Sequence, residues 1–116
     1  MKHTVEAIKT ISSNSDNART VVSQFCQEVV SEAQARLDRV KSIANLASIL
    51  DAGQLAVAAD ARAGVRHLYA ALQGIDEYHH RGSLAGQFGE ALQEVSGALQ
   101  EIEGLYRWLH MLYTRD

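Results

Sequence analysis

Apolar residues recur every three or four positions along most of this chain, which is the spacing of one face of an α-helix. The first stripe begins after the cap-forming residues Ser15 and Asp16 and stops before Gly53, a residue type that often ends helices. This pattern predicts a first helix over residues 16–51, about 50 Å long at 1.5 Å per residue. Its stripe consists of Val22, Cys26, Val29, Ala33, Leu37, Val40, Ala44 and Ala47.

Two further stripes follow at the same spacing. The second predicted helix ends before the segment HHRGS, where Gly82 terminates it, and the third begins after Ser83 as its N-cap. Because the connection over residues 81–83 is short, these two helices should lie antiparallel. The second stripe is Val57, Ala61, Val65, Leu68, Leu72, Ile75 and Tyr78, and the third is Leu84, Phe88, Ala91, Val95, Ala98, Ile102, Leu105 or Tyr106, Leu109 and Leu112.

These stripes predict an all-α fold: an antiparallel up-down-up bundle of three long helices with a short N-terminal helical arm. Residues 1–15 show a weak helical pattern that ends in the turn-forming segment SSNSDN, so we assign them to the arm. Residues 16–116 form the helical bundle domain. The chain has no proline among its 116 residues, which favours helices, because turns and edge strands of β-rich proteins usually contain several.

Two stretches carry more apolar side chains than one bundle face can bury. LYRWLHMLY (residues 105–113) ends the third helix, and IANLASIL (residues 43–50) ends the first. On a wheel of 100° per residue, both spread over most of the helix circumference. In an up-down-up bundle both stretches lie at one pole, together with LAVAA (residues 55–59) at the start of the second helix. The surplus predicts a protein interface there, and the alternative is an irregular bundle that covers these residues itself. The expected interface residues are Leu46, Ile49, Leu50, Tyr106, Trp108, Met111, Leu112 and Tyr113.

Glycines mark a second face of the third helix. Each costs about 1 kcal/mol relative to alanine inside a helix, so four of them need an explanation. One is a seam where another helix approaches closely, with two glutamines hydrogen-bonding across it; the other is a loose first helical turn. The residues on this face are Gly86, Gly89, Gly97, Gly104, Gln93 and Gln100.

Charge and cysteine content narrow the classes of function. The formal net charge of −3 and the lack of a basic face argue against nucleic-acid binding. Residues 42–59 carry one charge, Asp51, but Asn45, Gly53 and Gln54 interrupt them, so we expect no membrane span. The N-terminus lacks the apolar run of a signal peptide. A single cysteine, Cys26, excludes an internal disulfide and favours the cytoplasm.

One candidate metal site lies in the segment IDEYHHR. Asp76, His79 and His80 share a helical face, which suits a divalent cation only if further ligands come from elsewhere. The alternative is a solvated helix end, where histidines interact favourably with the helix dipole. No HExxH or CxxC motif occurs, and we expect no cofactor.

Other polar groups carry weaker signals. Cys26 belongs to an apolar stripe and should behave as a small hydrophobic residue. Arg62, Arg66 and Arg81 form a basic cluster that has too little charge and too few interleaved aromatic residues for a phosphate-binding face. The glutamates beside the third stripe lack the histidines of a di-iron bundle and indicate a solvated acidic edge. These are Glu90, Glu94, Glu101 and Glu103.

The sequence therefore predicts a non-enzymatic protein-interaction module, either an adaptor, a regulator or an inhibitor. It should act through an apolar helical surface and form a homodimer. One alternative is a neutralising partner of a toxin or nuclease from a mobile element or bacterial competition system. The other is a metal-binding helical bundle.

Overall fold

The computed structural model describes residues 16–79 and 86–115, except for the side chains of residues 16–18 and 47. Its elements are helix α2 (Asp16–Asn45), the short 3-10 helix η1 (Ala47–Ile49), helix α3 (Ala52–Tyr78) and helix α4 (Gly89–Thr114). All regular structure in these ranges is helical, as predicted. The expected N-terminal arm, residues 1–15, lies outside the described residues.

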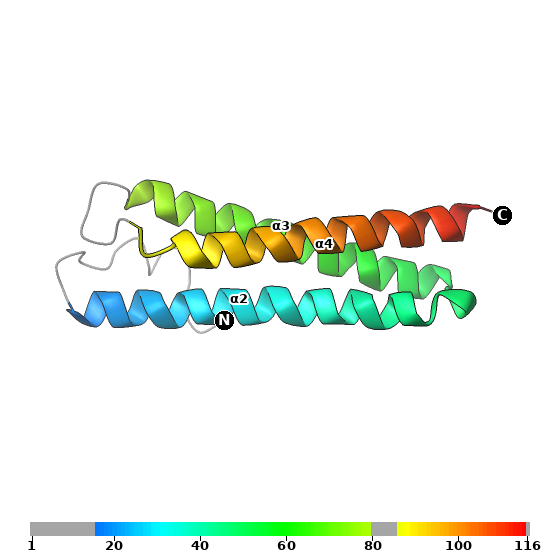
Figure 1. Ribbon diagram of the computed structural model, residues 1–116, viewed down its shortest axis with the longest axis horizontal. Helices are drawn as coiled ribbons and strands as arrows, with labels where there is room; N and C mark the ends of the chain where they lie inside the picture. The colour runs from blue at the N-terminus through cyan, green and yellow to red at the C-terminus, as the bar shows by residue number, and fades with distance from the viewer. Residues whose placement is uncertain (1–15, 80–85, 116) are drawn as a thin grey trace.

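The three long helices pack side by side into a rod of 57 × 22 × 18 Å. In Figure 1 the chain runs along α2, turns back along α3 and returns along α4. Each helix contacts both of the others, so the described chain is a three-helix bundle. The end of α2, the start of α3 and the end of α4 meet at one end of the rod (Figure 1).

The first helix ends earlier than predicted. It stops at Asn45 rather than near residue 51, and η1 leads into α3. Helix α3 begins with a capping box that the periodicity did not reveal. The Asp51 side chain accepts a 2.8 Å hydrogen bond from the Gln54 backbone N–H, and the Gln54 side chain accepts one of 3.1 Å from the Asp51 N–H. Gly53 therefore lies in the first turn of α3 and does not terminate α2.

The start of the last helix also differs from the prediction. Helix α3 ends at Tyr78, as expected, but α4 begins at Gly89 rather than just after Ser83. A turn over residues 86–88 precedes it, with Gly86 at a φ of 83°, a left-handed conformation that glycine adopts without strain. The Gly89 N–H closes this turn on the Gly86 carbonyl at 3.2 Å. Ser83 and Leu84 lie outside the described residues.

One apolar core runs along the rod, and it follows the predicted stripes with local changes. Phe25 enters the core beside Cys26, which is only partly buried. Val57 and Tyr78, both predicted to be buried, are 43% and 61% exposed. Ala58 takes the core position that was assigned to Val57, because adjacent helical side chains point about 100° apart. The largest fully buried residues are Phe25, Phe88, Leu72, Ile75, Ile102 and Leu109.

Candidate functional site

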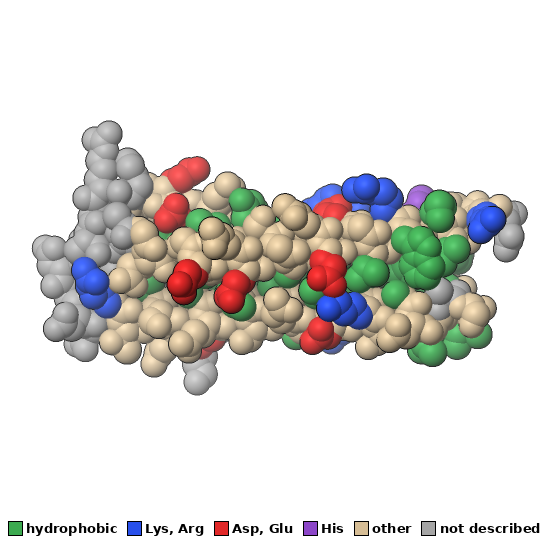
Figure 2. Space-filling view, in the orientation of Figure 1, with side chains coloured by type: hydrophobic (Ala, Val, Ile, Leu, Met, Phe, Trp, Pro, Cys, Tyr) green, Lys and Arg blue, Asp and Glu red, His purple; other side chains and the backbone are tan. Residues whose placement is uncertain are grey.

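Exposed large apolar side chains gather at the end of the rod where α2 ends, α3 begins and α4 ends. Figure 2 shows them as a green cluster there. Seven such side chains are exposed among the described residues, and six lie at this end. The seventh, Tyr78, ends α3 at the opposite end. We name the six the apolar collar; they are Leu46, Ile49, Val57, Trp108, Met111 and Tyr113.

The predicted interface residues all lie at this end, but to different depths. Leu46, Ile49, Trp108, Met111 and Tyr113 are exposed. The other three, Leu50, Tyr106 and Leu112, are half-buried. Val57 was not among the predicted interface residues, because its spacing assigned it to the second core stripe.

The collar exposes an apolar surface comparable to the largest patch of a typical monomer. Ile49 is 65% exposed, Met111 51% and Trp108 42%. With large side chains of ~150–250 Å² each, the six residues present on the order of 500 Å² of accessible surface. The largest apolar patch on a typical monomer is about 300–600 Å² and is often a binding site. The collar thus has the size of an interaction surface.

A hollow between α2 and α3 lies within the collar. It has a volume of about 540 Å³ and includes Ile43, Leu46 and Val57 in its lining. Ile43 is nearly buried, whereas Leu46 and Val57 remain exposed. Arg39 and Asp51 also line it and bring polar groups of both signs. This α2–α3 hollow is large enough to take an apolar side chain from another molecule.

Charges are distributed unevenly along the rod. Within residues 19–35, 70–79 and 86–97, far from the collar, Arg19 is the only arginine or lysine beside six carboxylates. The half that carries the collar, residues 36–69 and 98–115, has seven arginines and lysines against five carboxylates. The rod therefore has an acidic half and an apolar, mildly basic half. The six carboxylates belong to Glu28, Glu32, Asp76, Glu77, Glu90 and Glu94.

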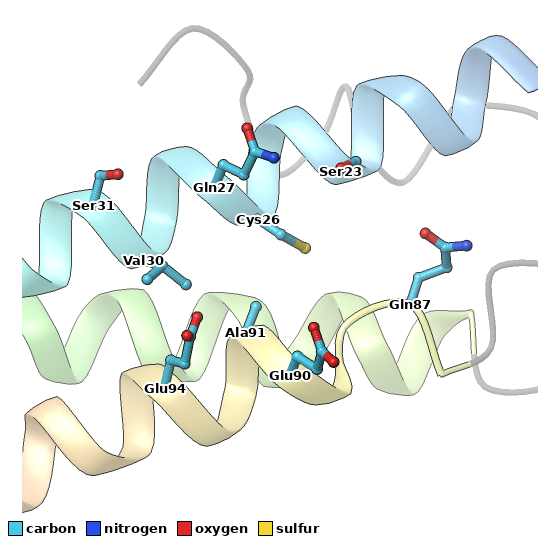
Figure 3. Close-up of a pocket in the computed structure, with 9 residues that line it drawn as sticks. All are labelled: Ser23, Cys26, Gln27, Val30, Ser31, Gln87, Glu90, Ala91 and Glu94. Atoms are coloured by element: carbon cyan, nitrogen blue, oxygen red, sulfur yellow. The ribbon is translucent and has the colours of Figure 1, made fainter.

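A polar groove between α2 and α4 lies in the acidic half. Its volume is about 330 Å³, and the Cys26 sulfur points into it between glutamine and glutamate side chains (Figure 3). Burial raises the pKa of the Cys26 thiol from its ordinary value of 9.0 to about 11. A thiol held protonated in this way is a poor nucleophile at neutral pH. Cys26 is therefore not an activated nucleophile.

The four glycines of the second predicted face have two different environments. Gly86 belongs to the turn before α4, and Gly89 is the first residue of the helix, as the loose-turn explanation expects. Gly97 and Gly104 lie inside α4, where a methyl group on either would meet no atom within 4 Å. Both glycines face open space in the single chain, so the seam explanation remains a hypothesis for these two alone.

The candidate metal residues are only partly placed. The His79 ring is buried, lies edge-on to Tyr78 with ring centroids 4.9 Å apart, and stacks on Phe88 at 6.2 Å. His80 lies outside the described residues. Within the ranges that the structure describes, no three histidine, cysteine or acidic side chains are grouped for metal binding. The metal site therefore stays a hypothesis without structural support.

None of the described helices combines the length and apolar character needed to cross a membrane. No protein-family model, curated protein or solved structure matches this chain. What the collar binds must therefore be inferred from its own residues and their surroundings.

Proposed function

We propose that this chain is a non-enzymatic protein-interaction module that associates with a second copy of itself through the apolar collar. Among the residues that the structure describes, six of the seven exposed large apolar side chains group at one end of the rod, and this grouping carries the proposal. Trp108 and Met111 belong to residue types that are enriched at the centres of protein interfaces. Such a dimer would serve as an adaptor, regulator or inhibitor in the cytoplasm.

The size of the collar supports a dimer. A stable protein–protein interface buries about 800 Å² on each partner. The collar supplies on the order of 500 Å² of apolar surface, and the half-buried residues Leu50, Tyr106 and Leu112 supply more. The α2–α3 hollow of about 540 Å³ gives an anchor from the second copy a place to insert. A contact confined to the collar end is therefore sufficient for moderate affinity.

The charge distribution favours contact at the collar over contact elsewhere. Two copies that meet side by side along the acidic halves would bring like charges together, which opposes association. Two copies that meet at their collars hold the acidic halves at opposite ends of the assembly. Because the rod is 57 Å long, these halves are then separated by several Debye lengths, about 8 Å each at physiological salt.

The up-down-up order of the helices is part of this proposal. An antiparallel arrangement of neighbouring helices puts the end of α2, with η1 after it, beside the start of α3 and the end of α4. Together these segments carry all six collar residues. A two-fold axis at this end would place each collar on its equivalent, as in an isologous dimer. Each copy would then offer exposed collar side chains for insertion and an α2–α3 hollow that receives a side chain of its partner.

Light scattering over a concentration series tests the proposal. Up to roughly 100 μM, where a dimer with a micromolar Kd is populated, we expect the mass of two chains. Trp108→Glu should give the mass of one chain with unchanged helicity by circular dichroism, because Trp108 is exposed. Gln100→Glu is the matched control, since it adds the same charge to the same helix outside the collar, and it should leave the dimer intact.

Two outcomes oppose the proposal. A wild-type chain that stays monomeric over the whole series rules out the homodimer. A Trp108→Glu variant that unfolds would instead show that Trp108 is needed for the core. In that case Ile49→Asp, at the most exposed collar position, decides whether the collar is the contact.

A further inference from the structure

A second hollow lies between α3 and α4, beside the collar but in a different groove from the α2–α3 hollow. Its volume is about 380 Å³, and its lining combines cationic and aromatic side chains from two helices. The sequence analysis did not predict this hollow, because it treated Arg62 and Arg66 as one basic cluster with Arg81. Arg81 lies outside the described residues. The lining residues are Arg62, Glu103, Tyr106, Arg107 and His110.

The orientation of Arg62 in this α3–α4 hollow is fixed from two sides. Its guanidinium carbon lies 4.1 Å from the centre of the Tyr106 ring, a cation–π contact. Its Nη1 lies 3.9 Å from Oε2 of Glu103. The Arg62 Nε is buried and has no hydrogen-bond partner among the described residues. A guanidinium held in this way keeps its remaining N–H groups available in a defined direction.

The single carboxylate in the hollow is already occupied. Arg66 donates from Nε to Oε1 and from Nη2 to Oε2 of Glu103, the second bond being 2.9 Å long. Such a bidentate pair satisfies a carboxylate well. Arg107 makes no ion pair with any described residue. Three arginines and one carboxylate therefore leave two positive charges at the hollow, with the imidazole of His110 beside Tyr106 at 6.0 Å between ring centroids.

We propose that the α3–α4 hollow binds the phosphate group of a small phosphorylated molecule. A phosphate monoester carries a charge of about −1.5 to −2 at neutral pH and three strong acceptor oxygens. This matches the excess of two positive charges at the hollow, with the Tyr106 hydroxyl and the His110 imidazole as further donors. The phosphate lies against Arg62 and Arg107, while the rest of the molecule stays in the open mouth, because Arg62 already covers the face of Tyr106.

Calorimetric titration with inorganic phosphate, with sodium chloride of matched ionic strength as reference, tests the site. The wild-type chain should bind one phosphate in a saturable manner. Arg107→Gln should weaken binding about tenfold, since it removes a hydrogen bond to a charged group. Arg39→Gln is the matched control, as this arginine lines the α2–α3 hollow instead, and it should bind like the wild type.

Glu103→Gln provides a test in the opposite direction. It removes the one negative charge of the hollow and releases Arg66, so phosphate should bind more tightly. Succinate, a dicarboxylate of similar charge, should bind more weakly than phosphate, and a short-chain phosphatidic acid no more tightly than inorganic phosphate. Tighter binding of the lipid would replace the small molecule by a lipid headgroup as the ligand.

Several results would overturn the site. These are heat effects no larger than those of chloride, equal losses in Arg39→Gln and Arg107→Gln, or weaker binding by Glu103→Gln. Because Arg107 is exposed, its substitution should leave the circular dichroism spectrum unchanged. The hollow lies within one chain, so the monomeric Trp108→Glu variant should also bind phosphate. The homodimer and the phosphate site can therefore fail independently.

Discussion

Arg66 of α3 and Glu103 of α4 face each other across the helix interface and share two hydrogen bonds, one of them 2.9 Å long. This contact raises the pKa of Arg66, which in any case stays protonated over the ordinary pH range. Because the Arg66 side chain is about half exposed, Arg66→Gln should lower the free energy of unfolding only slightly. Urea denaturation at low and high salt measures the effect, which should shrink as salt rises.

The Lys41–Glu101 pair between α2 and α4 is the natural comparison. Its single N–O contact is 3.0 Å long, and both side chains are about half exposed. A double-mutant cycle should give a larger coupling energy for Arg66 with Glu103, since a planar guanidinium holds both carboxylate oxygens. Equal couplings would mean that the bidentate geometry contributes nothing in solution.

Replacing Gly97 or Gly104 by alanine should stabilise the folded chain. Each lies inside α4 and faces open space, so alanine at either position adds helix propensity without a clash. We expect each substitution to raise the free energy of unfolding by about 0.5–1 kcal/mol, as measured by urea denaturation. The same variants test the seam hypothesis, because a dimer that used this face would weaken while the single chain became more stable.

Gly64 of α3 is the matched control for these two glycines. A methyl group there would lie 2.6 Å from Cζ of Arg36, whose guanidinium crosses the glycine from α2. Gly64→Ala must therefore displace that guanidinium from its 3.0 Å bond with Glu32. Its gain in stability should be smaller than that of Gly97→Ala, and a gain as large would show that Arg36 moves freely.

Helical periodicity predicted the number of helices and most of the core, because burial along a helix repeats every three to four residues. It assigned Cys26 to the first core stripe, but the adjacent Phe25 is fully buried in the core and Cys26 is only partly buried. It read Gly53 as a terminator, although Asp51 and Gln54 carry the side chains of a capping box.

The two candidate sites differ in how far the sequence alone could predict them. Five of the six collar residues lie in two short stretches, 43–50 and 105–113, where a local excess of apolar side chains predicts them. Only the bundle topology is then needed to bring the two stretches together. The α3–α4 hollow brings Arg62 of one helix next to Tyr106 and Arg107 of another, at a register that no single-helix pattern contains. Charges that converge from different helices become visible only when the packing is known.

Cys26 should react slowly with alkylating agents in the folded chain. Burial favours the neutral thiol and raises its pKa to about 11, so little thiolate is present near pH 8. Iodoacetamide, followed by mass spectrometry, should modify the folded chain far more slowly than the chain unfolded in urea. The rate should climb as the pH approaches 11. A folded chain that reacts as fast as the unfolded one would contradict the burial of this thiol.

The same pKa fixes the direction of a stability change at alkaline pH. The folded state holds the thiol proton more tightly than the unfolded state, whose thiol has a pKa near 9.0. The contribution to stability is therefore complete below about pH 9 and is lost as the pH rises toward 11. Cys26→Ser replaces the thiol by a group that does not titrate there, so its stability should vary less with pH over this window.

His79 should be replaceable by phenylalanine with a gain in stability. Its ring is 6% exposed and packs on Phe88 and Tyr78, while its buried Nε2 has no hydrogen-bond partner among the described residues. A buried polar group left unpaired costs about 1–3 kcal/mol, and phenylalanine keeps the ring contacts without that cost. We expect His79→Phe to raise the midpoint of urea denaturation. His79→Ala, which loses the ring contacts, should lower it, and His67→Phe on the exposed face of α3 should leave it unchanged. If His79→Phe destabilises the chain instead, the imidazole nitrogen has a hydrogen-bond partner from outside the described ranges.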